Sequence, residues 1–209
     1  MLCKQVEQAT TDANGALGFS ATVDTSVPAR VQQWTYNQNG QVLTYKDPLN
    51  NTTTNTYYSD TTAEHTMGDL ATVTNALNQV VARYTKYEPM GKWLEMVDAN
   101  GVTTKRTFDA RLRLKTTTAA SLTTSYDYWP TGLLKSVTMP DLSSVNYGYD
   151  DAHRLTSVTD NLGNKITYTL DNSGNRIGEN VTDPAGKLAK TLTRLPDALN
   201  RIQQVTGRD

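Results

Sequence analysis

Residues 149–163, YDDAHRLTSVTDNLG, contain two turn sequences separated by a short β-prone stretch. In the first turn, His153 stands where similar turns elsewhere in the chain have glycine. Histidine tolerates left-handed backbone geometry better than most residues. The second turn ends in Gly163, which adopts a positive φ without steric cost. Threonine and valine between the turns favour an extended strand. The stretch therefore predicts a β-hairpin.

The same frame recurs along the chain. Each copy begins with an anchor residue, aromatic or leucine, and most anchors follow one another at 20 or 21 residues. The wider interval after the first anchor predicts one degenerate unit with an insertion between residues 58 and 68. A period of this length is typical of short solenoid repeats and gives about eight units. The anchors are Tyr36, Tyr87, Phe108, Tyr128, Tyr149, Leu170 and Leu195.

The turn after the anchor carries a glycine four residues later in four copies. Such a glycine supplies the positive φ that tight hairpin turns require. Between the turns, apolar side chains alternate with polar ones, so that Tyr168 shares one face of a strand with its apolar neighbours. We therefore expect an all-β, solenoid-like array of antiparallel hairpins forming a curved sheet. The turn glycines are Gly40, Gly91, Gly132 and Gly174, the last following Asp171.

The repeats divide the chain into two segments. Residues 1–33 do not fit the frame, although residues 12–15 contain a turn signal, and we expect a lead-in segment of irregular or partial strands. Residues 34–209 hold the repeats, and the chain ends in mid-repeat at Asp209. This ending predicts a piece of a longer array.

Composition narrows the function classes. The chain has 37% hydrophobic residues, two phenylalanines and a net charge of -1, with threonine its commonest residue. This is too little apolar mass for an ordinary core, but it suits a one-layer wall.

The near-zero charge argues against a nucleic-acid partner, because phosphate contacts need clustered Lys and Arg. No apolar run is long enough for a membrane span or a cleavable signal, and Cys3 alone makes no internal disulfide.

The frame resembles the RHS, or YD, repeat family, which is named for a Tyr-Asp pair followed by Gly-Arg-Leu. In this family the repeats wind a β-sheet into a hollow shell, and in bacterial polymorphic toxins the shell encloses a C-terminal toxic domain. The resemblance implies a non-enzymatic scaffold without cofactors, whose partners are the rest of the shell, an enclosed toxin domain and secretion machinery. It also implies a secreted or cell-surface location in a bacterium. The matching residues are Tyr149-Asp150, Phe108-Asp109, Tyr126-Asp127, Arg113-Leu114, Arg154-Leu155 and Arg201-Ile202.

Asp183-Pro184 is superficially similar to the family's segment in which aspartates cut the toxin free. However, Lys187 stands where that segment has leucine, and Gly178 stands where it has proline. Asp183 also lies in register with the second turns of neighbouring units. We therefore interpret these residues as a turn.

Isolated reactive residues predict no catalytic, metal or cofactor site. His65 and Glu64 are adjacent and would point to opposite faces of a strand, which argues against a zinc site. Cys3 has no general base at a recognisable spacing. The aspartates and asparagines at turns match no calcium loop, so we assign them to turn formation.

The aromatic residues leave an alternative open. Trp34, Trp93 and Trp129 with their neighbouring tyrosines are expected to pack the sheet, because each ring buries a large area. The same rings on an exposed face would form a carbohydrate-binding stripe, typical of an extracellular adhesive module. A carboxylate-based hydrolase is a third possibility, but no motif locates its site. The tyrosines concerned are Tyr36, Tyr87, Tyr128 and Tyr147.

Overall fold

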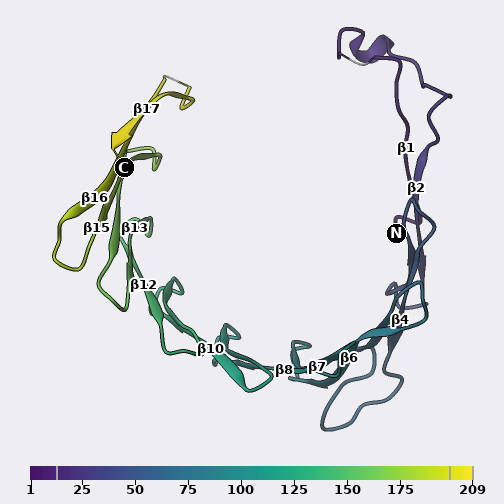
Figure 1. The fold of residues 1–209 in the computed structure, drawn as a ribbon. Coiled ribbons are helices and arrows are strands. Elements are labelled where there is room, and N and C mark those ends of the chain that lie inside the picture. Colours follow the sequence, from purple (N-terminus) through teal and green to yellow (C-terminus); the bar gives the residue numbers. More distant parts are fainter. Residues whose placement is uncertain (13, 198, 209) are drawn as a thin grey trace. The chain divides into compact units, whose positions relative to one another are not determined.

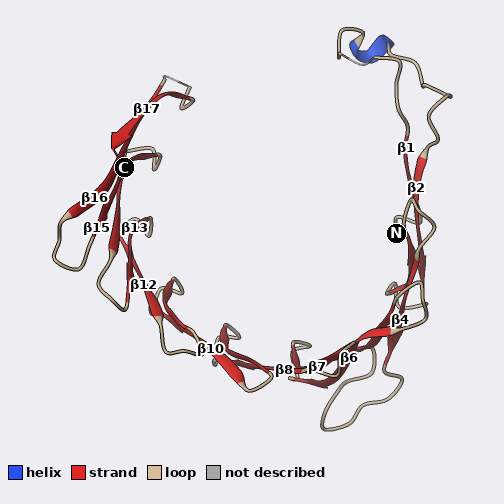
Figure 2. Cartoon of the chain, viewed as in Figure 1, coloured by secondary structure: helices blue, strands red, loops and turns tan. Residues whose placement is uncertain are grey.

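The computed structural model describes residues 1–12, 14–197 and 199–208. Ala13 in the predicted turn at 12–15, Ala198 in the last turn and the terminal Asp209 lie outside the described residues. The chain forms two compact units, Met1–Lys105 and Arg106–Asp209. In both units the strands pair antiparallel with their neighbours in sequence (Figures 1 and 2), which confirms the predicted all-β array of hairpins.

The first unit pairs its strands in chain order from β1 to β8. One short 3-10 turn, η1 (Gly18–Ser20), lies in the lead-in segment. The strands are β1 (Lys4–Glu7), β2 (Arg30–Tyr36), β3 (Val42–Lys46), β4 (Thr52–Tyr57), β5 (Leu70–Thr74), β6 (Val80–Tyr87), β7 (Trp93–Asp98) and β8 (Thr103–Phe108), whose last three residues belong to the second unit.

The second unit continues the same pattern from β9 to β17, and its row of strands is curved (Figure 1). The strands are β9 (Leu114–Ala119), β10 (Leu122–Tyr128), β11 (Leu134–Thr138), β12 (Ser144–Tyr149), β13 (Leu155–Asp160), β14 (Lys165–Leu170), β15 (Arg176–Thr182), β16 (Leu188–Pro196) and β17 (Ile202–Arg208).

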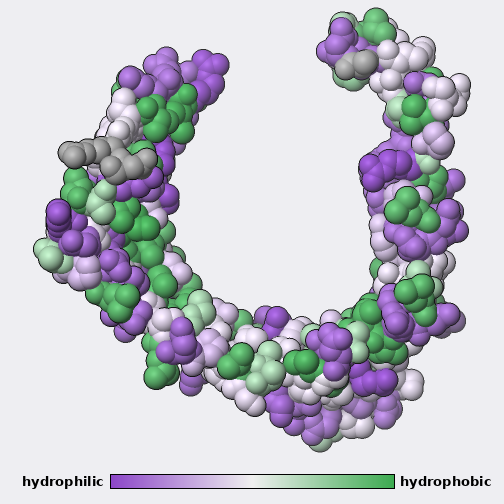
Figure 3. All heavy atoms as spheres, in the orientation of Figure 1, coloured by the Kyte–Doolittle hydropathy of each residue, from purple (hydrophilic) through white to green (hydrophobic). Residues whose placement is uncertain are grey.

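The sheet of the second unit has one apolar face and one polar face, because side chains alternate along each strand. On the apolar face Val137 pairs with Val145, and Val158 pairs with Ile166. Within the described residues Val137, 8% exposed, is the one buried hydrophobic side chain. Hydrophobic and hydrophilic residues accordingly lie side by side on the surface in Figure 3. The unit is therefore a single layer whose apolar face is only partly covered.

Threonine dominates the polar face. Its hydroxyls pair across neighbouring strands, at 2.6 Å between the Oγ1 atoms of Thr35 and Thr44 and at 2.7 Å between those of Thr107 and Thr116. Such cross-strand pairs stabilise a sheet without burying apolar area. They explain how a threonine-rich chain holds a sheet together without an ordinary core.

A β-bulge marks the anchor of the repeat. The pairing register shifts just before Tyr149, and similar shifts occur at other anchors. At the last repeat the shift falls at Pro196, directly before Asp197, so Pro196 and not Leu195 occupies the anchor position. The sequence frame was one residue out here because leucine matches an apolar anchor better than proline does. Shifts of the same kind fall at Tyr36, Tyr57, Tyr87, Tyr128 and Leu170.

Candidate functional site

The turn that follows each anchor is the most regular feature of the repeat. In residues 150–154, the Arg154 amide donates to Asp150 Oδ1 (2.8 Å) and its Nε donates to Oδ2 (2.7 Å). The His153 amide donates to the Asp150 carbonyl at 2.9 Å. The two bonds from Arg154 to the carboxylate, the side-chain one above all, lower the pKa of Asp150. Asp109 with Arg113 and Asp197 with Arg201 repeat the arrangement.

The fourth residue of these turns adopts a left-handed conformation. Gly132 has a φ of 98° and Gly174 a φ of 86°. His153 adopts φ 63°, the turn geometry expected of it, and Leu112 adopts φ 58° without the benefit of a glycine. The backbone therefore keeps the turn even where the family's glycine is replaced.

The anchor tyrosines close the end of each strand pair. The β11–β12 ladder stops at Ser136 and Asn146, and beyond it the Tyr149 hydroxyl donates to the Leu134 carbonyl at 3.0 Å. Burial raises the pKa of Tyr149. Sequence reasoning missed this role, although the preference for tyrosine over phenylalanine at the anchor is its signal. The same bond joins Tyr57 to Val42 (2.8 Å), Tyr87 to Leu70 (2.7 Å) and Tyr128 to Leu114 (2.9 Å).

Side chains at the fifth turn position link successive turns. The Arg113 Nη1 donates to the Trp129 carbonyl at 3.3 Å, and Arg154 Nη1 donates to the Asp171 carbonyl at 3.0 Å. In the next gap the side-chain Nδ2 of Asn175 donates to Asn200 Oδ1 at 3.1 Å. These bonds connect one hairpin to the next independently of the backbone ladder.

Tyr126-Asp127 does not occupy the position of the other Tyr-Asp pairs. Tyr126 lies within β10 opposite Val137, and Tyr128 with Trp129 stands in the repeat position two residues later. The Trp129 amide donates to the Leu133 carbonyl at 2.8 Å, so the turn forms without an aspartate.

The inserted loop at residues 58–69 places His65 differently from the expectation. His65 lies in a loop and not on a strand, and its ring stacks on the Tyr58 ring (3.5 Å between centroids). Its Nε2 lies 3.2 Å from Asp60 Oδ1 and its Nδ1 lies 3.3 Å from Thr62 Oγ1. Glu64 instead pairs with Lys86 at 2.7 Å. Among the described residues no three His, Cys, Asp or Glu side chains gather as metal ligands.

Two of the three tryptophans pack against tyrosines. Trp34 lies 5.3 Å from Tyr45 and Trp93 lies 5.8 Å from Tyr84, measured between ring centroids. Trp129 is 41% exposed, with the Lys135 ammonium 5.1 Å from its ring centroid.

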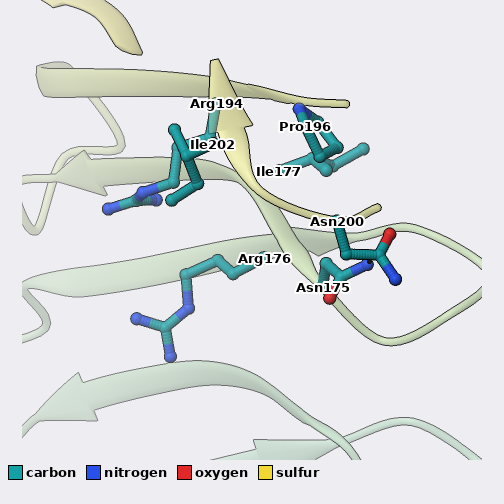
Figure 4. A pocket seen from close by; sticks show the side chains of 7 residues that line it. All are labelled: Asn175, Arg176, Ile177, Arg194, Pro196, Asn200 and Ile202. Carbon is teal, nitrogen blue, oxygen red and sulfur yellow. Dashed lines mark hydrogen bonds between the residues drawn. The ribbon is translucent and has the colours of Figure 1, made fainter. Parts of the chain in front are cut away.

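Hollows open between successive turns. One, of about 340 Å³, lies between the turns at residues 171–175 and 197–201 (Figure 4). Asn175 and Asn200 lie at one end of it and two arginines at the other, with the Arg194 and Arg176 guanidiniums 3.6 and 3.7 Å from Glu179. The chain's own charges therefore already occupy this hollow. The predicted turn at Asp183 is also formed, since the Lys187 amide donates to Asp183 Oδ1 at 2.8 Å.

Comparisons with known proteins agree with this architecture. The RHS Repeat family model matches residues 149–188. The crystal structure of TcdB2-TccC3 has a similar fold, with a TM-score of 0.72 and 20% identity over 97% of this chain and 12% of that chain. The Photorhabdus luminescens Tc holotoxin pore gives a TM-score of 0.70 and 19% identity over 97% of this chain and 11% of that chain. No curated protein matches the sequence.

The bulged anchors, Asp-Arg turns and meandering strands define an antiparallel β-hairpin repeat protein. Within it, residues 149–188 match the RHS Repeat model, where Tyr149-Asp150 and Arg154-Leu155 carry the resemblance seen in the sequence. The chain spans 12% or less of the length of the solved chains named above. The described part of the chain has no helix that is both long and apolar enough to cross a bilayer.

Proposed function

We propose that this chain is a wall segment of an RHS shell and that the complete shell encloses a toxin domain for delivery outside the producing cell. In this role the chain does no chemistry and binds no cofactor. Its partners are the remaining shell repeats and the enclosed domain. The observation that carries the proposal is the repeated hairpin frame, which shares its fold with the chains of TcdB2-TccC3.

Two physical features support a wall. Each hairpin is held to the next by a backbone ladder and, at several turns, by a side-chain bond such as Arg154 to the Asp171 carbonyl. A one-layer sheet joined in this way resists local opening, because an interior strand cannot separate without breaking bonds on both sides. Its threonine-rich face offers contacts without a strong charge preference.

The test uses the uninterrupted reading frame that contains residues 1–209. The purified product is digested with proteinase K, natively and after unfolding in guanidinium chloride, and the fragments are mapped by mass spectrometry. Enclosure predicts a segment outside the repeats that survives native digestion and is degraded after unfolding. Equal degradation of every non-repeat segment in both conditions would overturn the proposal.

A glycan array separates this function from the carbohydrate-binding alternative. The wall proposal predicts no glycan signal for the 209-residue chain. A signal that disappears with Trp129→Ala and survives Trp93→Phe would instead favour the adhesive module, because Trp129 is the more exposed ring.

A further inference from the structure

The gap between the turns at residues 129–133 and 150–154 differs from its neighbours. On either side an arginine crosses from one turn to the next, Arg113 in the preceding gap and Arg154 in the following one. The residue in the matching position here is Leu133, which has no hydrogen-bond donor in its side chain. A hollow of about 510 Å³ lies in this gap, lined among others by Trp129, Tyr149 and Asp151.

The preceding gap shows which chemistry fits such a space. The Arg113 guanidinium makes three contacts there. It pairs with the Asp109 carboxylate of its own turn at 2.7 Å, donates to the Trp129 carbonyl, and lies 4.5 Å from the centre of the Tyr128 ring. A carboxylate, a carbonyl and a tyrosine face therefore form the arginine slot of the repeat.

The hollow beside Leu133 presents equivalents of all three groups. Tyr149 is the anchor that corresponds to Tyr128, and Asp150 contributes the backbone carbonyl that corresponds to that of Trp129. The first turn position is here Trp129, so the turn supplies no carboxylate of its own. Asp151 lines the hollow instead. It is exposed, and within the part of the chain that the structure describes its carboxylate has no hydrogen-bond or ion-pair partner.

We propose that this hollow is a docking slot for an arginine side chain of another polypeptide segment. The guanidinium stacks on the Tyr149 ring, donates to the Asp150 carbonyl and pairs with Asp151. The apolar surfaces of Trp129 and Leu133 cover the aliphatic part of the incoming side chain. Asp150 is not the charge partner, because its carboxylate is held by Arg154 at 2.7 Å.

The slot selects arginine over lysine. A planar guanidinium stacks on an aromatic ring and donates in two directions at once, whereas an ammonium is a compact, strongly hydrated charge. The inference concerns any arginine-bearing partner and does not depend on enclosure of a toxin domain.

The test follows the indole N–H signal of Trp129 by NMR while N-acetyl-arginine-N-methylamide is added to the 209-residue chain. We expect a saturable shift in the millimolar range and a weaker response to the matching lysine compound. Asp151→Asn should weaken binding by up to about fivefold, the size of one exposed ion pair.

Leu133→Arg supplies the guanidinium from within the chain and should abolish the saturable shift while preserving the fold. Leu162→Arg makes the same change in the exposed turn at the other end of β13 and should leave binding intact. Binding that persists in Leu133→Arg, an equal response to lysine, or no saturable shift in the unaltered chain would each overturn the proposal. Circular dichroism of each variant confirms that the sheet is retained.

Discussion

The turns at residues 129–133 and 150–154 occupy equivalent places in successive hairpins but are held differently. Both have the same backbone bonds, from Gly132 to the Trp129 carbonyl at 2.9 Å and from His153 to the Asp150 carbonyl at 2.9 Å. Only the second adds a carboxylate cap and an arginine that reaches the next turn. The comparison teaches that the backbone alone reverses the chain, while the Asp-Arg pair links neighbouring hairpins.

The largest expected effect tests the backbone part of this comparison. Gly132→Ala forces a side chain into a φ of 98° in the turn that has no carboxylate cap. We expect the free energy of unfolding to fall by roughly 1–2 kcal/mol, the usual cost of left-handed geometry. Urea denaturation measures it. His153→Ala is the matched control and should change stability less, because the native residue already bears this cost. Equal losses at the two positions would contradict the prediction.

The next effect concerns the tyrosine that precedes each turn. Tyr149→Phe removes the hydroxyl that satisfies the Leu134 carbonyl and should cost about 1 kcal/mol. Tyr128→Phe removes the matching bond to Leu114 and should cost a similar amount. Similar losses of unfolding free energy in urea denaturation would show that the tyrosine hydroxyl bond does not depend on the side chains of the turn that follows. A loss at Tyr149 only would show that the Asp-Arg pair contributes to it.

Leu112 provides a change in the opposite direction. It holds φ 58° in the turn at residues 109–113, where the family's pattern has glycine. Leu112→Gly should stabilise the chain by up to about 1 kcal/mol, since the strain it relieves exceeds the added entropy of the unfolded chain. Thermal unfolding measures the gain. An unchanged or lower melting temperature would show that the Leu112 side chain makes a compensating contact.

Much of this architecture could be predicted from the sequence, because the repeat is local. A turn signal and an alternating strand act within about twenty residues, so period and hairpin follow from spacing alone. The frame failed at one anchor, where Leu195 was preferred to Pro196. It placed the anchor at Tyr128 correctly, although Tyr126-Asp127 two residues earlier also matched the Tyr-Asp motif.

The empty arginine slot lay outside the reach of the sequence pattern. It depends on side-chain contacts between two successive turns, from the fifth position of one turn to the anchor 15 or 16 residues later, and repeat spacing does not reveal such contacts. In the sequence Leu133 is an ordinary apolar residue. Its position becomes informative only in the structure, where Arg113 and Arg154 cross the neighbouring gaps. The loop that places His65 against Tyr58 is likewise an insertion with no repeat partner to align with.

The smallest expected effect is a pH dependence that turns with an Asp-Arg pair should show and the turn at residues 129–133 should not. Hydrogen bonds from Arg154 lower the pKa of Asp150, and those from Arg113 lower the pKa of Asp109, relative to about 3.9 in the unfolded chain. A lowered folded-state pKa gives a contribution to stability that is present above the unfolded value and is lost as pH falls through the folded value. The carboxylate caps should therefore weaken below about pH 4.

Amide exchange measured by NMR, corrected for intrinsic pH dependence, resolves this turn by turn. The protection of the His153 amide should decrease as pH falls from about 5 to about 2, because the adjoining carboxylate loses its charge. The Gly132 amide makes the same backbone bond in a turn without a carboxylate, and its protection should stay constant relative to the β12 amides. A parallel decrease at Gly132 would mean that acid opens the whole hairpin, and the cap would then contribute nothing local. A decrease confined to His153 would show that the Asp-Arg pair stabilises its own turn as well as linking it to the next.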